Sequence, residues 1–231
     1  MSIPRPVFEG IGLTKSYRRG PEVVRALTDA TITIPPGDLV ALVGPSGSGK
    51  TTLLNILCGW EEPDSGRFIW KGNETIVSPR ELGWSEIAVV PQSVGLIEEL
   101  TIHENVDLPA RLGTPGEAGA GDRLIADLGL AELKDRLPAE VSLGEQQRAA
   151  LARALVSSPA LLLADEPTGH QDSVWARGVM RALRTACAEG TACLVATHNP
   201  EVLRYVDRIL GIRDGRVGDL PHDDLMRTTS S

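Results

Sequence analysis

Cysteine is scarce in this chain: only Cys58, Cys187 and Cys193 occur among its 231 residues. An odd number of cysteines, at spacings that fit no metal-binding motif, gives no support for a disulfide framework or a cysteine-ligated metal. The neighbouring residues are apolar or helix-forming. We therefore predict that all three thiols are buried and unreactive.

Positive charge is also in deficit. Lys and Arg number 23 against 31 for Asp and Glu, and the formal net charge is -8. Proteins that bind nucleic acid usually present a basic face. The charge balance therefore argues against a nucleic-acid partner, although a small local basic patch is compatible with it.

Long apolar runs are missing as well. No run approaches the roughly 20 residues that a membrane-spanning helix needs. Residues 1–9 lack the apolar segment of a signal peptide. We expect the chain to stay in the cytosol and to reach a membrane only through a partner protein.

The sequence does contain the patterns of one globular α/β domain. The hydrophobic fraction is 42% and the charged fraction 23%, both ordinary for a soluble globular protein. Residues 7–17 and 26–34 alternate apolar and polar side chains, which predicts half-exposed antiparallel strands. A helix is predicted over residues 50–58. Strands buried on both faces are predicted at four apolar runs, residues 39–43, 87–90, 161–164 and 192–196. Buried strands separated by helices predict a mainly parallel sheet.

Residues 97–143 lack strong strand signals. Thr101, followed three residues later by Glu104, forms a capping-box pattern that predicts a helix over residues 101–112. A break rich in Gly, Pro and Ala covers residues 113–121, and a second helix is predicted over residues 122–128. We interpret this stretch as a mainly helical subdomain inserted into the α/β core, and we expect the polar tail to be frayed.

A glycine-rich loop follows the predicted strand at residues 39–43. It matches the pattern G-x-x-x-x-G-K-[ST] and consists of Gly44, Pro45, Ser46, Gly47, Ser48, Gly49, Lys50 and Thr51, with Thr52 next. Glycines let the backbone approach phosphate oxygens, and N–H groups at a helix start attract anions. We predict that Lys50 contacts the β- and γ-phosphates of ATP and that the Thr51 hydroxyl ligates Mg²⁺. A purely structural glycine turn is the weaker alternative.

Two acids, Asp165 and Glu166, follow the apolar run at residues 161–164. Ligands of open α/β sheets bind at the carboxyl ends of the strands. We predict that Asp165 belongs to the Mg²⁺ shell and that Glu166 activates the attacking water beside the γ-phosphate. Alone, the pair would fit an acidic turn that caps the next helix equally well, but the phosphate loop upstream favours the catalytic interpretation.

Residues 141–148 read VSLGEQQR. This segment resembles the signature of ATP-binding cassette (ABC) ATPases, usually written LSGGQ or LSGGE followed by QQR. In that family the segment starts a helix that faces the γ-phosphate bound by a second subunit. The resemblance implies that Ser142 and Gly144 contact the nucleotide of a partner chain, so that ATP holds a homodimer together. The residues alone also fit a helix that begins after Ser142 as N-cap.

Leu143 stands where the family usually has glycine. Leucine adds bulk and resists positive φ, so we predict a tighter or shifted contact with the nucleotide and slower hydrolysis. This departure leaves an alternative function open: an ATP-gated regulatory module with weak hydrolysis that acts on a membrane partner, as in cell-division complexes.

Four further residues match functional positions of the family. Gln92 matches the Q-loop glutamine, which contacts Mg²⁺ or water, and His198 matches the switch histidine near the γ-phosphate. Tyr17 matches the aromatic residue on which adenine stacks, and Asp172 matches the D-loop aspartate. The resemblance therefore implies catalytic roles for Lys50, Glu166 and His198.

The resemblance covers residues 7–217, and segments 13–17, 45–57 and 165–169 look most like the macrolide-exporter and lipoprotein-releasing group. It implies a P-loop NTPase fold of the ABC-ATPase type. The α/β core with an antiparallel β subdomain would take up about residues 7–96 and 144–217, the helical subdomain residues 97–143 and the tail residues 219–231. His170 and Gln171 stand where relatives typically have Asn-Leu. His170 is either a pH-sensitive addition or tolerated variation, and we favour tolerated variation.

In that group, two cassettes close on ATP and move a permease by mechanotransmission. The resemblance implies a transmembrane permease as partner, bound near the segment from Ser93 to Leu100, at the cytoplasmic face of the membrane. Glu98 and Glu99 would meet basic permease residues there, although exposed charge is the simpler interpretation. The chain has neither the long coiled-coil insertion of DNA-repair ABC ATPases nor the second cassette of translation factors. The permease would set the cargo.

Overall fold

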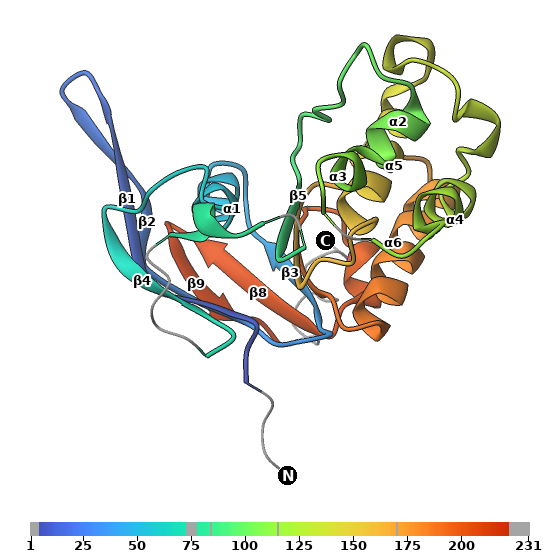
Figure 1. The fold of residues 1–231 in the computed structure, drawn as a ribbon. Coiled ribbons are helices and arrows are strands. Elements are labelled where there is room, and N and C mark those ends of the chain that lie inside the picture. The colour runs from blue at the N-terminus through green and yellow to red at the C-terminus, as the bar shows by residue number, and fades with distance from the viewer. Residues whose placement is uncertain (1–4, 73–77, 84, 115, 170, 222–231) are drawn as a thin grey trace.

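Two β-sheets and a group of helices make up the structure, a computed structural model that describes residues 5–72, 78–83, 85–114, 116–169 and 171–221 (Figure 1). The larger sheet has the strand order β5-β6-β7-β3-β8-β9 and the smaller one β2-β1-β4. The strands are β1 (Phe8–Arg19), β2 (Glu22–Ile34), β3 (Leu39–Val43), β4 (Ser65–Trp70), β5 (Ile87–Val90), β6 (Leu161–Asp165), β7 (Ala192–Ala196), β8 (Arg208–Arg213) and β9 (Arg216–Asp219).

The α-helices are α1 (Lys50–Leu57), α2 (Ile102–Val106), α3 (Leu108–Arg111), α4 (Ala120–Asp127), α5 (Leu143–Leu155) and α6 (Ser173–Ala188). Short 3₁₀ turns are η1 (Pro79–Glu81), η2 (Ala131–Leu133), η3 (Pro138–Glu140) and η4 (Val202–Tyr205). Figure 1 shows α2 to α6 grouped on one side of the large sheet, and α1 between that sheet and the small sheet. None of the helices in the described ranges combines the length and hydropathy that a membrane crossing requires.

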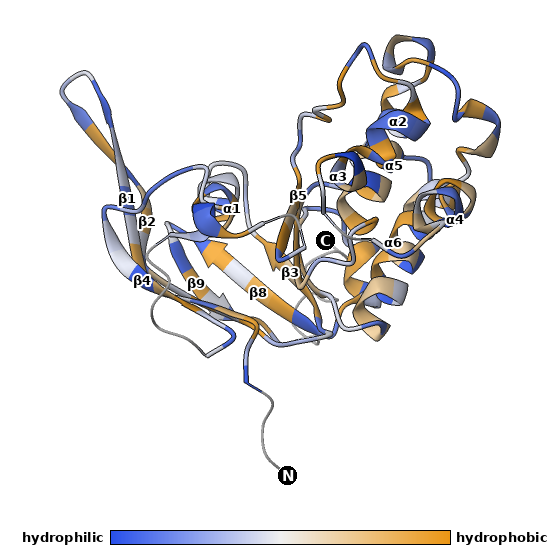
Figure 2. Cartoon of the chain, viewed as in Figure 1, coloured by the Kyte–Doolittle hydropathy of each residue, from blue (hydrophilic) through white to orange (hydrophobic). Residues whose placement is uncertain are grey.

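The large sheet lies between two apolar cores, which explains its short, continuously apolar strands. Along β3, Leu39 and Ala41 face the core beneath α5 and α6, whereas Val40 and Leu42 face the core shared with α1 and the small sheet. Strands buried on both faces lose the alternation of a half-exposed strand. Figure 2 accordingly shows the central strands as mostly hydrophobic, while the tip of the β1–β2 hairpin is hydrophilic. The predicted parallel core is confirmed.

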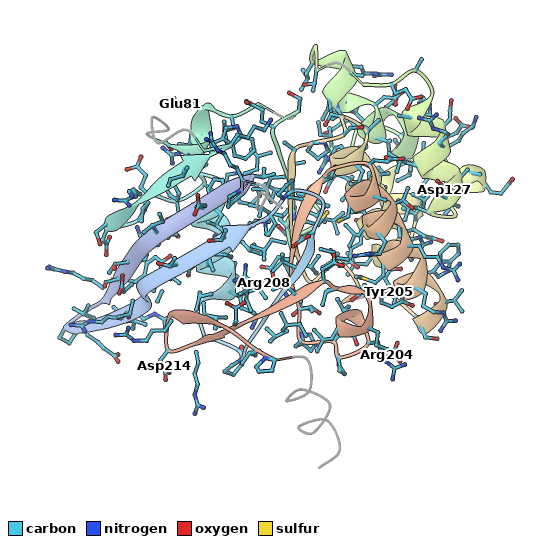
Figure 3. All side chains as sticks on the ribbon, turned by 90° about the horizontal axis from the view of Figure 1, so that it is seen from below. Glu81, Asp127, Arg204, Tyr205, Arg208 and Asp214 are labelled. Carbon is cyan, nitrogen blue, oxygen red and sulfur yellow. The ribbon has the colours of Figure 1, made fainter. Side chains whose placement is uncertain are left out.

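The small sheet is antiparallel, as predicted for residues 7–17 and 26–34. β9, which the sequence patterns did not predict, forms one edge of the large sheet and pairs antiparallel with β8. Arg208 on β8 ties this edge down: its Nη1 donates to the Thr33 carbonyl over 2.9 Å, and its Nε contacts Asp219 Oδ1 at 2.5 Å. Figure 3 places Arg208 on β8 and Asp214 at the turn between the two strands.

The helical stretch after β5 follows the prediction in part. Thr101 is the N-cap of α2, and its capping box with Glu104 is confirmed. The single helix predicted over residues 101–112 is wrong, because the chain turns at Asp107 and divides it into α2 and α3. Pro109 lies in the first turn of α3 and has no N–H to continue the α2 hydrogen-bond ladder. The second helix, α4, starts at Ala120 rather than at residue 122.

The three cysteines are buried and free, as predicted. Burial raises the pKa of the Cys58 thiol to about 11. A hydrogen bond with Cys187, followed by burial, raises the pKa of Cys193. Thiols with raised pKa values hold little of the reactive thiolate at neutral pH, so the expected lack of reactivity has a physical basis.

Candidate active site

The glycine-rich loop between β3 and α1 forms a cradle that only glycine permits at two positions. A Cβ on Gly44 would lie 2.3 Å from the Ile212 carbonyl oxygen, and one on Gly49 would lie 2.4 Å from the Ala26 carbonyl oxygen. Gly49 also has a φ of +108°. The loop is therefore pressed against β8 and β2 with its backbone exposed on the other side, which suits phosphate binding.

Lys50 at the start of α1 lies across this loop. Its Nζ donates to the carbonyl oxygens of Gly44 and Pro45 over 2.7 and 3.1 Å. Within the described part of the chain, the buried Ser48 hydroxyl has no hydrogen-bond partner. An ammonium that donates to neutral carbonyls, and a buried hydroxyl without a partner among the described residues, fit an incoming phosphate group.

The Thr51 hydroxyl and the Asp165 carboxylate meet where α1 begins and β6 ends. Thr51 Oγ1 donates to Asp165 Oδ2 over 2.9 Å. Burial raises the pKa of Asp165, and the charge of Glu166 adds to the shift. A nearby cation would offset both effects. Gln92 lines the same cleft, of ≈ 560 Å³, as Thr51 and Asp165.

This donor set fits Mg²⁺ bound together with a nucleotide. Among the described residues, no group of three or more His, Cys, Asp or Glu could hold a metal by itself. Mg²⁺ at nucleotide sites commonly takes one or two protein ligands and fills its shell with phosphate oxygens and water. A hydroxyl, one carboxylate and a neighbouring amide satisfy that requirement.

The Glu166 carboxylate is held by groups that follow β7. Its Oε1 accepts the His198 backbone N–H over 3.0 Å and lies 2.6 Å from His198 Nδ1, while its Oε2 accepts the Thr197 hydroxyl over 3.1 Å. The parallel register pairs Asp165 with Ala196, so the residues that follow each strand meet. Glu166 has a φ of +50°, a rare conformation for a non-glycine residue that occurs often at functional sites.

Thr197 is a contact that the sequence reading missed. Its position between a buried strand and His198 was the available signal. The structure does bring together Glu166 and His198, the two residues for which the family resemblance implied catalytic roles.

Tyr17 on β1 reaches the start of α1. Its hydroxyl donates to Glu61 Oε2 over 2.5 Å, and the Thr52 hydroxyl lies close enough to influence it. Burial, followed by the neighbouring Glu61, raises the pKa of Tyr17. Lys15 lies 5.7 Å from the centre of the Tyr17 ring. Tyr17 therefore lies beside the phosphate loop, and Glu61 is a partner that sequence patterns alone did not indicate.

The helix that begins after Ser142 is α5. Ser142 is its N-cap, and Glu145 completes a capping box: Oε2 of Glu145 accepts the Ser142 N–H over 2.7 Å, and Ser142 Oγ accepts the Glu145 N–H over 3.3 Å. Leu143 is the first helical residue and is not among the residues with positive φ. The expectation that leucine would resist the backbone conformation here is therefore wrong, because the site asks for ordinary helical geometry. Its side chain is 45% exposed.

Ser142, Gly144 and Asp172 do not join the phosphate loop of the same chain. Figure 1 shows α1 and α5 on opposite sides of the large sheet. No hydrogen bond in the described ranges links Ser142 or Gly144 to residues 44–51. Asp172 instead caps α6, accepting the N–H groups of Val174 and Trp175 over 2.9 Å each. His170 lies outside the described residues.

These features define a class. A phosphate loop between a buried strand and a helix, with two acids at the carboxyl end of a nearby parallel strand, is the arrangement of a P-loop NTPase. Comparison with known proteins then narrows the class. Residues 27–169 match the sequence family described as ABC transporter. The chain therefore belongs to the ABC transporter family. Within such a transporter it is the subunit that binds and hydrolyses ATP.

Two curated relatives illustrate the match. The chain is 40% identical over 218 residues to the lipoprotein-releasing system ATP-binding protein LolD 1 of Rhodospirillum rubrum, covering 89% of this chain and 94% of the relative. It is 40% identical over 219 residues to the macrolide export ATP-binding/permease protein MacB of an Azoarcus species, covering 92% of this chain. It spans only 33% of that relative.

Solved structures agree. A dimeric ATP-binding cassette in a post-hydrolysis state, bound to ADP and Pi, superimposes with a TM-score of 0.82 at 30% identity, covering 93% of this chain and 99% of the other. A second dimeric bacterial ABC transporter cassette gives a TM-score of 0.79 at 32% identity with the same coverage. The predicted ABC-ATPase fold is confirmed.

Proposed function

We propose that this ATPase works as a homodimer in which each ATP lies between the phosphate loop of one chain and the α5 start of the other. One observation carries the proposal. Lys50, Asp165 and Glu166 meet at one end of the parallel strands, whereas Ser142 and Gly144 lie at the start of α5, away from the phosphate loop of the same chain. Helix starts attract anions, so a second copy supplies the missing contact. The dimeric state of the matched cassettes supports this arrangement.

Within each site, we assign the chemistry to Lys50, Glu166 and His198. Lys50 leaves its carbonyl contacts and binds the β- and γ-phosphates. Glu166 accepts the proton of the attacking water, and His198, hydrogen-bonded to it, orients the carboxylate and meets the γ-phosphate. Tyr17 stacks on adenine, and Asp172 at the α6 start faces the second chain.

Thr51, Asp165 and Gln92 are the residues that would hold Mg²⁺. The ion supplies charge neutralisation at the phosphate oxygens. The residues themselves orient the ligand set: Thr51 is fixed at the first turn of α1, and Asp165 at the end of β6. Gln92 comes from the segment after β5 and stands between Pro91 and Ser93, which line both this cleft and the neighbouring groove.

A complementation assay tests the shared site. Lys50→Ala removes the phosphate contact, and Ser142→Asp keeps an N-cap oxygen but adds negative charge where the partner's γ-phosphate is expected. Each variant alone should lose most ATPase activity. A mixture of the two should recover activity, because a heterodimer contains one site with an intact Lys50 and an intact Ser142. If the mixture stays inactive while both variants keep the wild-type Tm, the shared site is wrong. Glu166→Gln serves as the hydrolysis-deficient control.

We further propose that a transmembrane permease binds the groove next to the nucleotide cleft and holds the cassette at the cytoplasmic face of the membrane. The groove has a volume of ≈ 840 Å³ and shares Trp60, Val89, Pro91 and Ser93 with the nucleotide cleft. Trp60 is 55% exposed and Ile97 39%. Exposed aromatic and apolar side chains of this kind are common anchors of protein interfaces.

The segment from Ser93 to Leu100 borders this groove in a fixed conformation. The buried Asn105 side chain accepts the Ile97 N–H over 2.8 Å and donates to the carbonyls of Ile97 and Leu100. Arg153 in the groove donates to the Gly95 carbonyl over 2.9 Å, and no carboxylate pairs with it in the described ranges. We therefore expect a permease segment with an apolar anchor and a carboxylate. The names of the relatives, an ATP-binding protein of a lipoprotein-releasing system and a macrolide export ATP-binding/permease protein, support export as the direction of transport.

Affinity purification from detergent-solubilised membranes tests the docking groove. The tagged wild-type chain should retain a membrane protein with a permease sequence, identified by mass spectrometry. Trp60→Ala and Arg153→Ala should release it, whereas Val23→Ala, at an exposed position on the β1–β2 hairpin, should not. Equal retention by all four chains would place the permease elsewhere.

A further inference from the structure

The Gln171 side chain joins the loop after Glu166 to the start of α5. Its Nε2 donates to the Gly144 carbonyl over 2.7 Å and lies 3.3 Å from Gln147 Oε1. Its Oε1 accepts from Arg148 Nη1 over 2.8 Å. One amide thus holds the first two turns of α5 by both its donor and its acceptor.

Arg148 makes this connection costly to break. The side chain is 4% exposed, and its Nε donates to the Leu128 carbonyl over 2.8 Å. Its guanidinium lies 4.1 Å from the centre of the Trp175 ring. Burial lowers the pKa of Arg148 despite the charges of Glu145 and Asp172. A buried guanidinium needs acceptors for its N–H groups, and Gln171 supplies one of them.

The backbone ties Gln171 to the catalytic glutamate. The Gly169 N–H donates to the Glu166 carbonyl over 3.0 Å, and the Gln171 N–H donates to the Thr168 carbonyl over 3.3 Å. Thr168 is 3% exposed. Two successive turns therefore connect Glu166, which serves the nucleotide of its own chain, with the α5 start, which serves the partner's nucleotide under the proposed function.

We propose that Gln171 is a positioning residue that sets the orientation of the Ser142–Gly144 turn for the nucleotide of the partner chain. The donor half of its amide carries this role, through the Gly144 carbonyl. The acceptor half satisfies the buried Arg148. The proposal rests on the shared site proposed above. A purely structural Gln171 would act only by satisfying Arg148, whereas a positioning Gln171 also acts through the Gly144 carbonyl.

Two variants of similar size separate the donor role of the Gln171 amide from its acceptor role. Gln171→Leu removes donor and acceptor. Gln171→Glu keeps an acceptor for Arg148, but its carboxylate cannot donate to Gly144. We expect Gln171→Leu to lower the Tm and to raise the ATP concentration for half-maximal hydrolysis about tenfold, the effect of losing a hydrogen bond to a contacting element. Gln171→Glu should keep or raise the Tm and still show a raised half-maximal concentration. Normal half-maximal concentrations in either variant would overturn the proposal.

A mixing experiment identifies the site on which Gln171 acts. Gln171→Leu chains are mixed with an excess of Lys50→Ala chains, and wild-type chains with the same excess provide the reference. In such heterodimers, the only working phosphate loop belongs to the Gln171→Leu chain, and an α5 with an intact Gln171 covers it. We expect the half-maximal ATP concentration to return to the reference value. A value that stays raised would show that Gln171 acts through its own Glu166 and would refute the positioning role.

The shared site and the positioning role of Gln171 would be refuted by different results. If Lys50→Ala and Ser142→Asp chains do not complement each other, the shared site falls. If they do complement and the Gln171 variants keep wild-type ATP dependence, only the role of Gln171 falls.

Discussion

Leu143 offers the sharpest test of how closely the second chain approaches the nucleotide. It is the first residue of α5, it has ordinary helical geometry, and its side chain is 45% exposed in the single chain. The backbone therefore does not ask for glycine, and any effect on hydrolysis must come from the bulk of the side chain. Leu143→Ala removes that bulk and keeps the helix, whereas Leu143→Gly also weakens the helix.

The exposure of Leu143 determines how much each substitution should destabilise the fold. Full burial of leucine stabilises a fold by roughly 1.5–3 kcal/mol. Leu143 is about half exposed, so Leu143→Ala costs the fold on the order of 1 kcal/mol. That corresponds to a Tm decrease of about 2–4 °C for a chain of this length. Glycine adds roughly 0.8–1 kcal/mol through its lower helix propensity. If bulk holds the second chain away, Leu143→Ala should raise the ATPase rate about threefold, equal to about 0.65 kcal/mol of the barrier.

The assay is the steady-state ATPase rate at saturating ATP, measured with the Tm of each variant. Leu137→Ala is the matched control, because Leu137 is 39% exposed and precedes α5. The control should change neither rate nor ATP dependence. An unchanged rate in both Leu143→Ala and Leu143→Gly would refute the reasoning. A change confined to Leu143→Gly would assign the effect to the helix rather than to the bulk of leucine.

Three further predictions concern stability. Burial raises the pKa of Asp165, so without nucleotide the free energy of unfolding falls as pH rises through the raised pKa. Asp165→Asn should flatten this pH dependence and raise the Tm at neutral pH by about 2–4 °C, which corresponds to on the order of 1 kcal/mol. The same variant should lose ATPase activity. Gly129→Ala would place Cβ 1.9 Å from Trp175 Cη2 at a φ of +68°, so thermal unfolding should show a loss of about 2–5 kcal/mol. The control Gly113→Ala has a φ of +87° and would meet no described atom within 4 Å, so it should lose about 1–2 kcal/mol. Glu145→Ala should cost about 1 kcal/mol in urea unfolding through loss of the capping box, and Glu145→Gln, which preserves the box, much less.

Local patterns predicted the strands that are buried on both faces, because short, continuous apolar runs are typical of such strands. They missed β4, β8 and β9. Arg67 interrupts the apolar pattern of β4, and β9 has a single apolar residue, Val217. β4 forms through pairing with β1, which is distant in the sequence, and β9 through a hairpin with β8. Such pairing leaves little trace in the residue pattern of a short strand.

The candidate site likewise has one part that the sequence predicted and one part that it did not. The phosphate loop was recognisable because glycine, lysine and threonine stand at fixed spacing within one turn. The contact between Glu166 and His198 depends on β6 and β7 being neighbours in the sheet, and the sequence does not state strand order. The partners of Gln171 could not be predicted at all, since Gly144 and Arg148 lie 27 and 23 residues away and meet it only once α5 and α6 have packed.

This division has a mechanical consequence. Asp165, Glu166 and Thr197 stand at the ends of adjacent strands that are buried on both faces and paired in register, so their relative positions change little without loss of the core. The α5 start is held to the loop after Glu166 by the side-chain hydrogen bonds of Gln171 rather than by strand pairing. Changes in the strand ends should therefore lower hydrolysis whatever the ATP concentration, while changes in the Gln171 contacts should be corrected by more ATP. Under the proposed shared site, the strand ends that serve a chain's own nucleotide would therefore be rigid, and the α5 start that serves the partner's nucleotide would be adjustable.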